Sequence, residues 1–227
     1  MEGWGLYLAF MIPPLVLGLA VQAWLKRTFA RYSQVDIGAG ISGAQVARQL
    51  LDRNGLSEVP VEISPGGPLS DHYDPRKKAL FLSEPVYTPP SIAAAAVAAH
   101  ETGHALQDSR GYVPLKLRSA MYPAVAFAST AWIWLLILGA VLNALNLVAL
   151  ALLLYAVAVL FHLVTLPVEF NASRRASAQL RELGIVGAGE QAGVNKVLTA
   201  AALTYVAGAL AALSMLLYYA LMFFGRD

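Results

Sequence analysis

The sequence predicts a membrane α-helical protein in which four transmembrane helices carry one polar α+β domain. Of the 227 residues, 58% are hydrophobic and only 13% are charged, and the mean hydropathy of +0.58 is too high for a soluble globular chain. Four uncharged apolar stretches each reach the length of about 20 residues that a helix needs to cross a bilayer. Between the first and the second stretch the chain becomes polar and carries strand and turn signals.

The first apolar stretch, Trp4 to Leu25, predicts an anchor over residues 1–26. A cleaved signal peptide carries positive charge before its apolar core, but Lys26 and Arg27 follow it here. We therefore expect the anchor to be retained in the membrane.

The polar residues 27–118 predict the α+β domain. Ser42 followed by Gln45 matches a capping box at the start of a short amphipathic helix. Val59 to Ser64 and Lys78 to Ser83 predict strands, and residues 71–75 between them predict a turn. A small sheet beside the helix described next is the expected arrangement.

Residues 91–107 predict a helix that carries the pattern His-Glu-x-x-His. Ser91 can cap it, and the alanines that follow favour helix formation. Positions i and i+4 lie on one face of a helix, so His100 and His104 can bind one metal ion, with Glu101 placed as the general base for water. Zinc is the metal that this pattern favours, although two helical histidines can also occur at this spacing by chance. The chain has no cysteine, which excludes thiolate ligands and disulfides.

The next two apolar stretches, Tyr122 to Leu142 and Leu145 to Leu166, predict a transmembrane hairpin over residues 119–168. Only Asn143 and Ala144 separate them, so the turn must be tight. Residues 169–197 then predict a polar helical segment, and residues 198–227 contain the fourth span, Leu198 to Phe224.

The positions of basic residues predict the orientation. Of the 16 lysines and arginines, all but Arg226 lie within residues 26–118 and 169–197. Because cytoplasmic segments are enriched in Lys and Arg, we expect both of these segments in the cytoplasm and both termini outside. The basic residues thus follow the membrane side, and nothing indicates nucleic-acid binding.

A catalytic zinc site takes three protein ligands and leaves one position open. Glu169 is the strongest candidate for the third ligand, because a carboxylate at the end of a spanning helix is costly unless it has a partner. The alternative is an interfacial glutamate paired with Arg174 or Arg175. His72 and His162 are the other candidates, and His162 more readily fits a buried histidine of the helix bundle.

Of the residues that follow Glu169, three are candidates for contacts with the zinc ligands: Asn171, Ser173 and Arg174. Ser173 lies one turn further along the same face and can hydrogen-bond a ligand histidine. Asn171 is a weaker candidate for the same contact, and Arg174 is a third.

The segments AVAAHETGHALQ, SDHYDPR and LPVEFNASRRA resemble the YugP-type membrane zinc peptidases of bacteria, from about residue 35 to 205. The order of motifs is also similar to the HtpX-type proteases, which are gluzincins. The resemblance implies a zincin-like catalytic domain in the bacterial inner membrane, with His100, His104 and Glu169 as zinc ligands and Glu101 as general base. The family pattern has an aspartate at the place of Asn171, and Ser173 stands at the place of the gluzincin aspartate, so the residues around the ligands depart from it.

The function predicted is that of an integral-membrane zinc endopeptidase acting on membrane or membrane-proximal polypeptides. The strand Lys78 to Ser83 is the candidate edge for binding substrate, although it also fits an ordinary edge strand. His72 is the first candidate for stabilising the oxyanion, ahead of Tyr73, Tyr112 and Arg174. A zinc hydrolase acting on other bonds, an assembly protein that keeps zinc as a staple, and a channel are the rival classes.

Overall fold

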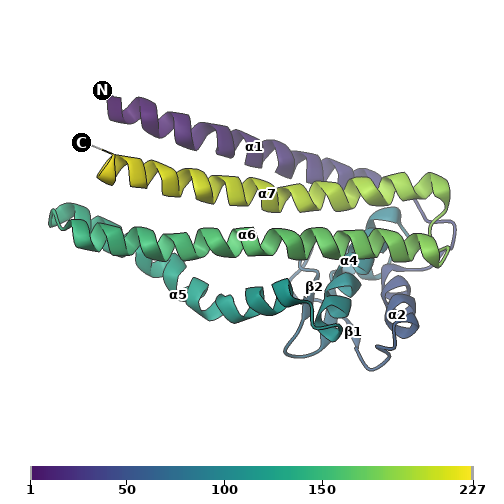
Figure 1. Cartoon of the computed structure of the whole chain (residues 1–227). Helices are drawn as coiled ribbons and strands as arrows, with labels where there is room; N and C mark the ends of the chain where they lie inside the picture. The colour runs from purple at the N-terminus through teal and green to yellow at the C-terminus, as the bar shows by residue number, and fades with distance from the viewer. Residues whose placement is uncertain (1, 226–227) are drawn as a thin grey trace. The chain divides into compact units, whose positions relative to one another are not determined.

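The computed structural model describes residues 2–225, with side chains from Trp4 onward, and this part of the chain is mostly helical. Figure 1 shows the long helices and the short elements between them. The elements, in chain order, are α1 (Glu2–Tyr32), α2 (Gly43–Arg53), β1 (Val61–Ile63), β2 (His72–Asp74), β3 (Ala79–Leu82), α3 (Glu84–Tyr87), α4 (Ile92–Ser109), α5 (Val113–Val141), α6 (Leu145–Glu182) and α7 (Ala188–Phe224).

The chain divides into two compact units. The first, here called the helical unit, comprises Met1–Gln22, Val113–Pro167 and Thr204–Asp227. The second, here called the mixed unit, comprises Ala23–Tyr112 and Val168–Leu203. The helices α1, α6 and α7 each contribute residues to both.

Four described helices are long and apolar enough to cross a membrane, as the sequence predicts: α1, α5, α6 and α7. The predicted hairpin turn is tight. Ala144 N–H donates to the Gly139 carbonyl at 2.8 Å, and Asn143 takes a positive φ of 52°. Around this turn, α5, α6 and α7 pack on a core that includes Leu136, Val148 and Leu152.

A hydrogen bond from α7 replaces a backbone hydrogen bond that is missing inside α1. In α1, Pro14 has no N–H to give to the carbonyl of Phe10, four residues earlier. The Ser214 hydroxyl of α7 donates to this carbonyl instead, at 2.6 Å. Because lipid offers no alternative donor, a side chain that satisfies the carbonyl stabilises the proline-containing helix in a membrane.

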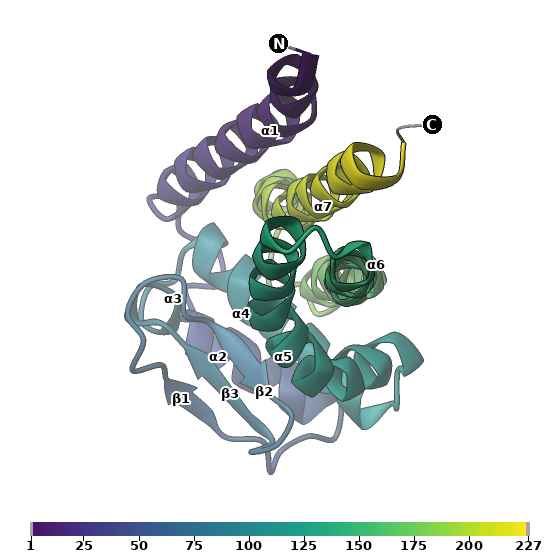
Figure 2. The ribbon, with the colours of Figure 1, turned by 90° about the vertical axis from the view of Figure 1, so that its left-hand side faces the viewer.

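The mixed unit contains a three-stranded sheet in the order β1-β3-β2, which Figure 2 shows. The strand β3 runs parallel to β1 and antiparallel to β2. Two predictions are therefore wrong. The strand near Lys78 to Ser83 is central rather than an edge, and residues 72–74 form an edge strand rather than part of a turn. The strand β2 is short and polar, so its sequence lacks the alternating apolar pattern that would predict a strand.

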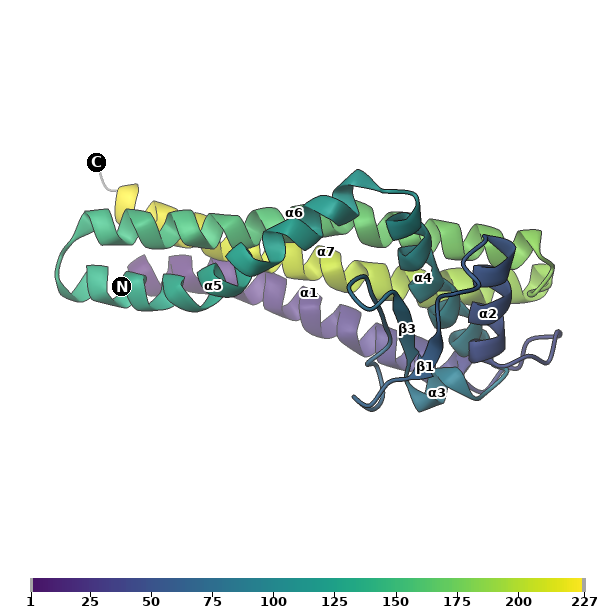
Figure 3. The same cartoon turned by 90° about the horizontal axis from the view of Figure 1, so that it is seen from below.

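The helix α4 lies at the centre of the mixed unit. Ser91 caps it, accepting from Ala94 N–H at 3.2 Å. One side packs through Ile92, Ala95 and Ala99 on the last turns of α6 and the first of α7. Another side packs through Ala94 and Ala98 on α2 and the sheet, and Figure 3 shows α2 and the sheet near α4. Because both sides are buried, small side chains let the neighbouring elements approach closely.

A close approach of α6 to α4 comes at Gly103, opposite Ala172. A Cβ atom added to Gly103 would lie 2.8 Å from the Ala172 carbonyl oxygen and 3.2 Å from its Cα. These are backbone atoms, so no side-chain rotation relieves the overlap. Only glycine permits this separation of the two helices.

Substituting Gly103→Ala should therefore push α4 and α6 apart and destabilise the mixed unit by about 1–3 kcal/mol, as overpacking does in other cores. Thermal unfolding of the detergent-solubilised protein measures this change. The matched control is Gly189→Ala in α7, where a Cβ meets nothing within 4 Å. Equal stability of the two variants would show that the close approach at Gly103 does not affect the free energy of unfolding.

Substituting Ser214→Ala should leave the Phe10 carbonyl without its donor and lower stability by ~0.6 kcal/mol, with ~1.7 kcal/mol as an upper bound for such bonds in membranes. Ser129→Ala serves as control, because the Ser129 hydroxyl donates to Ala126 within its own helix. Unfolding of both variants in the same detergent decides whether the contact between helices matters more than the local one.

Candidate metal centre

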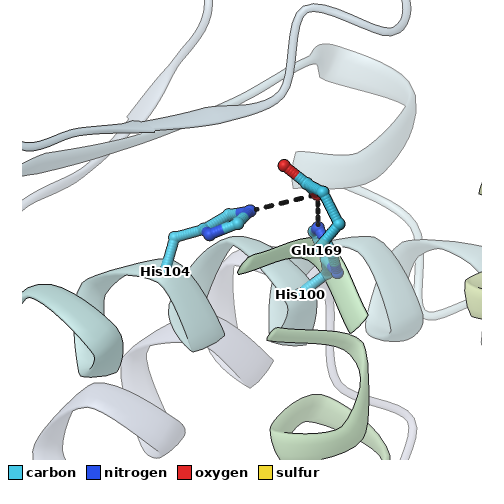
Figure 4. A group of neighbouring side chains, drawn as sticks. All are labelled: His100, His104 and Glu169. Atoms are coloured by element: carbon cyan, nitrogen blue, oxygen red, sulfur yellow. Dashed lines mark hydrogen bonds and ion pairs between the residues drawn. The ribbon is translucent and has the colours of Figure 1, made fainter. Parts of the chain in front are cut away.

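Three side chains from two distant segments converge in the mixed unit. His100 and His104 come from α4 and Glu169 from α6, and their ligand atoms all lie within 4.8 Å of one another. Glu169 Oε2 lies 3.2 Å from His100 Nε2 and 3.6 Å from His104 Nε2 (Figure 4). The Glu169 side chain is only 2% exposed and each imidazole 13%. A buried carboxylate facing two imidazoles is the donor set that a zinc ion takes in catalytic sites.

Both imidazoles are held from behind by a hydrogen bond at Nδ1. His100 Nδ1 lies 3.1 Å from the Ser173 hydroxyl, and His104 Nδ1 lies 3.0 Å from Gln107 Oε1. Such bonds fix the ring orientation and leave Nε2 facing the place where the donors meet. The residues present therefore fit a bound zinc ion.

The electrostatics of the group favour a cation. Burial by itself lowers the pKa of His104, but the hydrogen bond to Glu169 and the negative charges of Glu101 and Glu169 outweigh it and raise this pKa overall. A positive charge on this imidazole is thus stabilised by the two carboxylates, and a metal cation at Nε2 would meet the same negative surroundings.

Glu101 lies beside the group, buried on α4, and is held by the edge strand. Its Oε2 accepts the backbone N–H of Tyr73 in β2 at 3.1 Å. The Tyr73 hydroxyl donates to Asp108 Oδ2 at 2.8 Å, and Lys78 pairs with the same oxygen. Burial and the bond to Asp108 raise the pKa of Tyr73, so the phenol keeps its proton. Tyr73 of β2 thus contacts α4 twice, at Glu101 within the HExxH pattern and at Asp108 one turn beyond it.

The outer edge of β2 is turned toward Glu101. Tyr73 pairs with Leu80 of β3, but its N–H goes to Glu101, so this is a pair without ladder hydrogen bonds. In such a pair the N–H and C=O of one residue point to the same side. The C=O of Tyr73 therefore also points away from β3.

The structure brings some of the predicted residues together and places others apart. His100, His104 and Glu169 meet, Ser173 contacts His100, and Asn171 contacts Gln107, the partner of His104. Ser173 thus contacts a histidine of the group directly, whereas Asn171 reaches His104 only through Gln107.

His72 is exposed in β2, where its ring stacks on Phe81 with 5.0 Å between ring centroids and its Nδ1 lies 2.8 Å from the Ser70 carbonyl. Phe81 lies on the face of the sheet opposite Leu80 and Leu82, which face the core with α2 and α4. Arg174 is exposed on α6, and His162 belongs to the helical unit. The roles of His72 and Arg174 stay predictions.

Sequence reasoning missed Gln107 and the backbone of Tyr73, and it considered Arg175 only as a partner of Glu169, whereas Arg175 Nε donates to Asn171 Oδ1 at 2.7 Å. Gln107 lies three residues after His104 on the same helix face, and that spacing was a usable signal. The contact of Tyr73 with Glu101 depends on strand pairing, which no local pattern indicates.

Comparisons with known proteins agree with this geometry. The model of a family described as "Putative neutral zinc metallopeptidase" matches residues 7–224. A protein of Bacillus subtilis (strain 168) described as "Putative membrane protease YugP" is 48% identical over 223 residues, which cover 98% of this chain and 99% of that protein. No solved structure matches the chain.

The resemblance seen in the sequence motifs is thereby confirmed. The relative's description and the four apolar helices together indicate a multi-pass membrane protein. The match of the family model over nearly the whole chain, with two imidazoles and a carboxylate in place for the metal, shows that this chain belongs to that family of zinc metallopeptidases.

Proposed function

We propose that the protein is an integral-membrane zinc endopeptidase in which His100, His104 and Glu169 hold the metal and Glu101 is the general base. The observation that carries the proposal is that two imidazole nitrogens from α4 and one buried carboxylate from α6 lie together. His100 and Glu169 are 69 positions apart in the sequence. Among the described residues this group has three members, the number that leaves one zinc position open for solvent.

When bound at such a site, zinc supplies a Lewis acid that polarises the scissile carbonyl and lowers the pKa of a water molecule to about 7. Glu101 takes the proton of the attacking water while the new C–O bond forms at the carbonyl carbon. The same carboxyl then gives this proton to the amide nitrogen as the C–N bond breaks. Its position beside the two ligand histidines, held by the Tyr73 N–H, suits both transfers.

We assign the substrate backbone to the outer edge of β2, in place of the Lys78 to Ser83 strand that the sequence favoured. The C=O of Tyr73 points outward beside Glu101 and is placed to accept an N–H from an extended peptide. The bond from the Tyr73 hydroxyl to Asp108 holds this strand on α4, and Lys78, just before β3, pairs with the same carboxylate. An extended segment of a membrane or membrane-proximal polypeptide is the proposed substrate.

The distribution of Lys and Arg supports an orientation with the mixed unit in the bacterial cytoplasm and both termini outside, in the inner membrane. The hairpin turn between α5 and α6 then lies outside.

Substituting Glu101→Gln should leave zinc binding intact and reduce peptide hydrolysis by about 10²–10⁴-fold, the usual contribution of a general base. Zinc content of the purified protein and cleavage of an unfolded reporter polypeptide are the two measurements. His100→Ala is the comparison, because it should lose zinc and activity together. Undiminished hydrolysis by the Glu101→Gln variant would rule out the proposed mechanism, whereas a wild-type protein that holds zinc but cleaves no polypeptide would favour a structural zinc.

The absence of native cysteine makes the orientation directly testable. Leu142→Cys, at the exposed hairpin turn, should react with a membrane-impermeant maleimide in intact cells, whereas Lys77→Cys, exposed beside the sheet, should react only after permeabilisation. The reverse labelling pattern would place the metal centre outside the cytoplasm.

A further inference from the structure

We propose that Gln107 is a positioning residue for His104, and that Asn171 and Arg175 set its orientation. The chain of contacts runs Arg175 to Asn171 to Gln107 to His104, joining α6 to α4. Its effect is to hold the proton of the imidazole on Nδ1 and to present the Nε2 lone pair to the metal. The inference rests on the proposed function only in taking His104 as a zinc ligand.

The first step fixes which end of the Gln107 amide faces α6. The Gln107 side chain is fully buried, and its nitrogen lies 2.8 Å from the Val168 carbonyl oxygen. A carbonyl can only accept, so the amide nitrogen and not the oxygen must face Val168. The Gln107 oxygen is then left to face His104, where it accepts from Nδ1 at 3.0 Å.

The second step fixes the other hydrogen of the same amide. Gln107 Nε2 also donates to Asn171 Oδ1 at 3.1 Å. The Asn171 oxygen cannot be exchanged for its nitrogen, because Arg175 Nε donates to it at 2.7 Å and a guanidinium has no acceptor. Each amide in this series of hydrogen bonds therefore has one allowed orientation. The Gln107 oxygen, which faces His104, requires a hydrogen on His104 Nδ1.

The other ligand histidine lacks this constraint. The Ser173 hydroxyl beside His100 Nδ1 can donate or accept, so it orients the ring without deciding where the proton lies. Gln107 also links the two halves of the centre, since Val168, whose carbonyl it binds, is the residue before Glu169. A change at Gln107 should therefore affect zinc affinity more than a change in general packing would.

The test measures zinc affinity of the detergent-solubilised full chain by competition with a chromophoric chelator, together with the absorption spectrum of the Co²⁺-loaded protein. Gln107→Met preserves size and removes every hydrogen bond, and it should weaken zinc binding by ~10- to 100-fold, as loss of such supporting contacts does in other zinc sites. Asn171→Leu should weaken binding in the same direction. Asn171→Asp keeps an oxygen for both donors and should retain the zinc affinity that Asn171→Leu loses.

The matched control is Gln191→Met in α7, since Gln191 bonds Ser177 and Asn195 in the same unit and none of the zinc ligands. It should leave affinity and the cobalt spectrum unchanged. The double variant with Gln107→Met and Asn171→Leu should bind zinc no more weakly than Gln107→Met alone. Both substitutions interrupt the same series of hydrogen bonds, so their effects should not add.

Three results would overturn the inference: unchanged affinity and spectrum for Gln107→Met, an equal loss for Gln191→Met, or an Asn171→Asp variant as weak as Asn171→Leu. None of these readouts needs a substrate. Loss of affinity on changing Gln107, in a protein that cleaves no polypeptide, would support the positioning role and overturn the peptidase proposal.

Discussion

The proposed metal centre depends on how closely the backbones of α4 and α6 approach at Gly103 and Ala172. A carboxylate side chain is short, and it reaches two imidazoles on a neighbouring helix only if the two helix axes are close. Gly103 lies between the two histidines in sequence, so the point without a side chain coincides with the turn that must face Glu169. The alanines around it extend the same close packing over the rest of α4. The missing Cβ at Gly103 thus permits the helix separation at which the three proposed ligands lie together.

The two histidines proposed as ligands are held by unlike hydrogen-bond partners. His104 is held by a series of groups that can each act in only one way, whereas His100 is held by a hydroxyl that can act in two. A rigid ligand paired with a more adaptable one suits a centre whose coordination changes during a reaction, because one bond can stay fixed while the other adjusts. The same series of bonds joins α4 to the turn of α6 that carries Glu169, so orientation of the imidazole and placement of the carboxylate are coupled.

Much of this arrangement could be predicted from local patterns. The capping box at Ser42, the cap at Ser91 and the tight turn at Asn143 follow from spacings within a few residues, and all three are present. The pairing of the histidines with Glu169 was also predictable, because a buried carboxylate needs a partner. The sheet was not, since the order of three short strands depends on contacts across the chain. A stretch such as His72 to Asp74 resembles a turn until β3 lies beside it.

The length of β2 has a consequence for what the protein can act upon. Of its three residues, only Tyr73 turns its backbone groups outward, and Pro75 has no N–H to offer two positions further on. A polypeptide docked there gains few main-chain bonds, and a helix gains none until one of its turns unwinds, because its own amides are already paired. Selection among polypeptides at this edge would then depend on how readily a segment adopts an extended conformation rather than on its side chains.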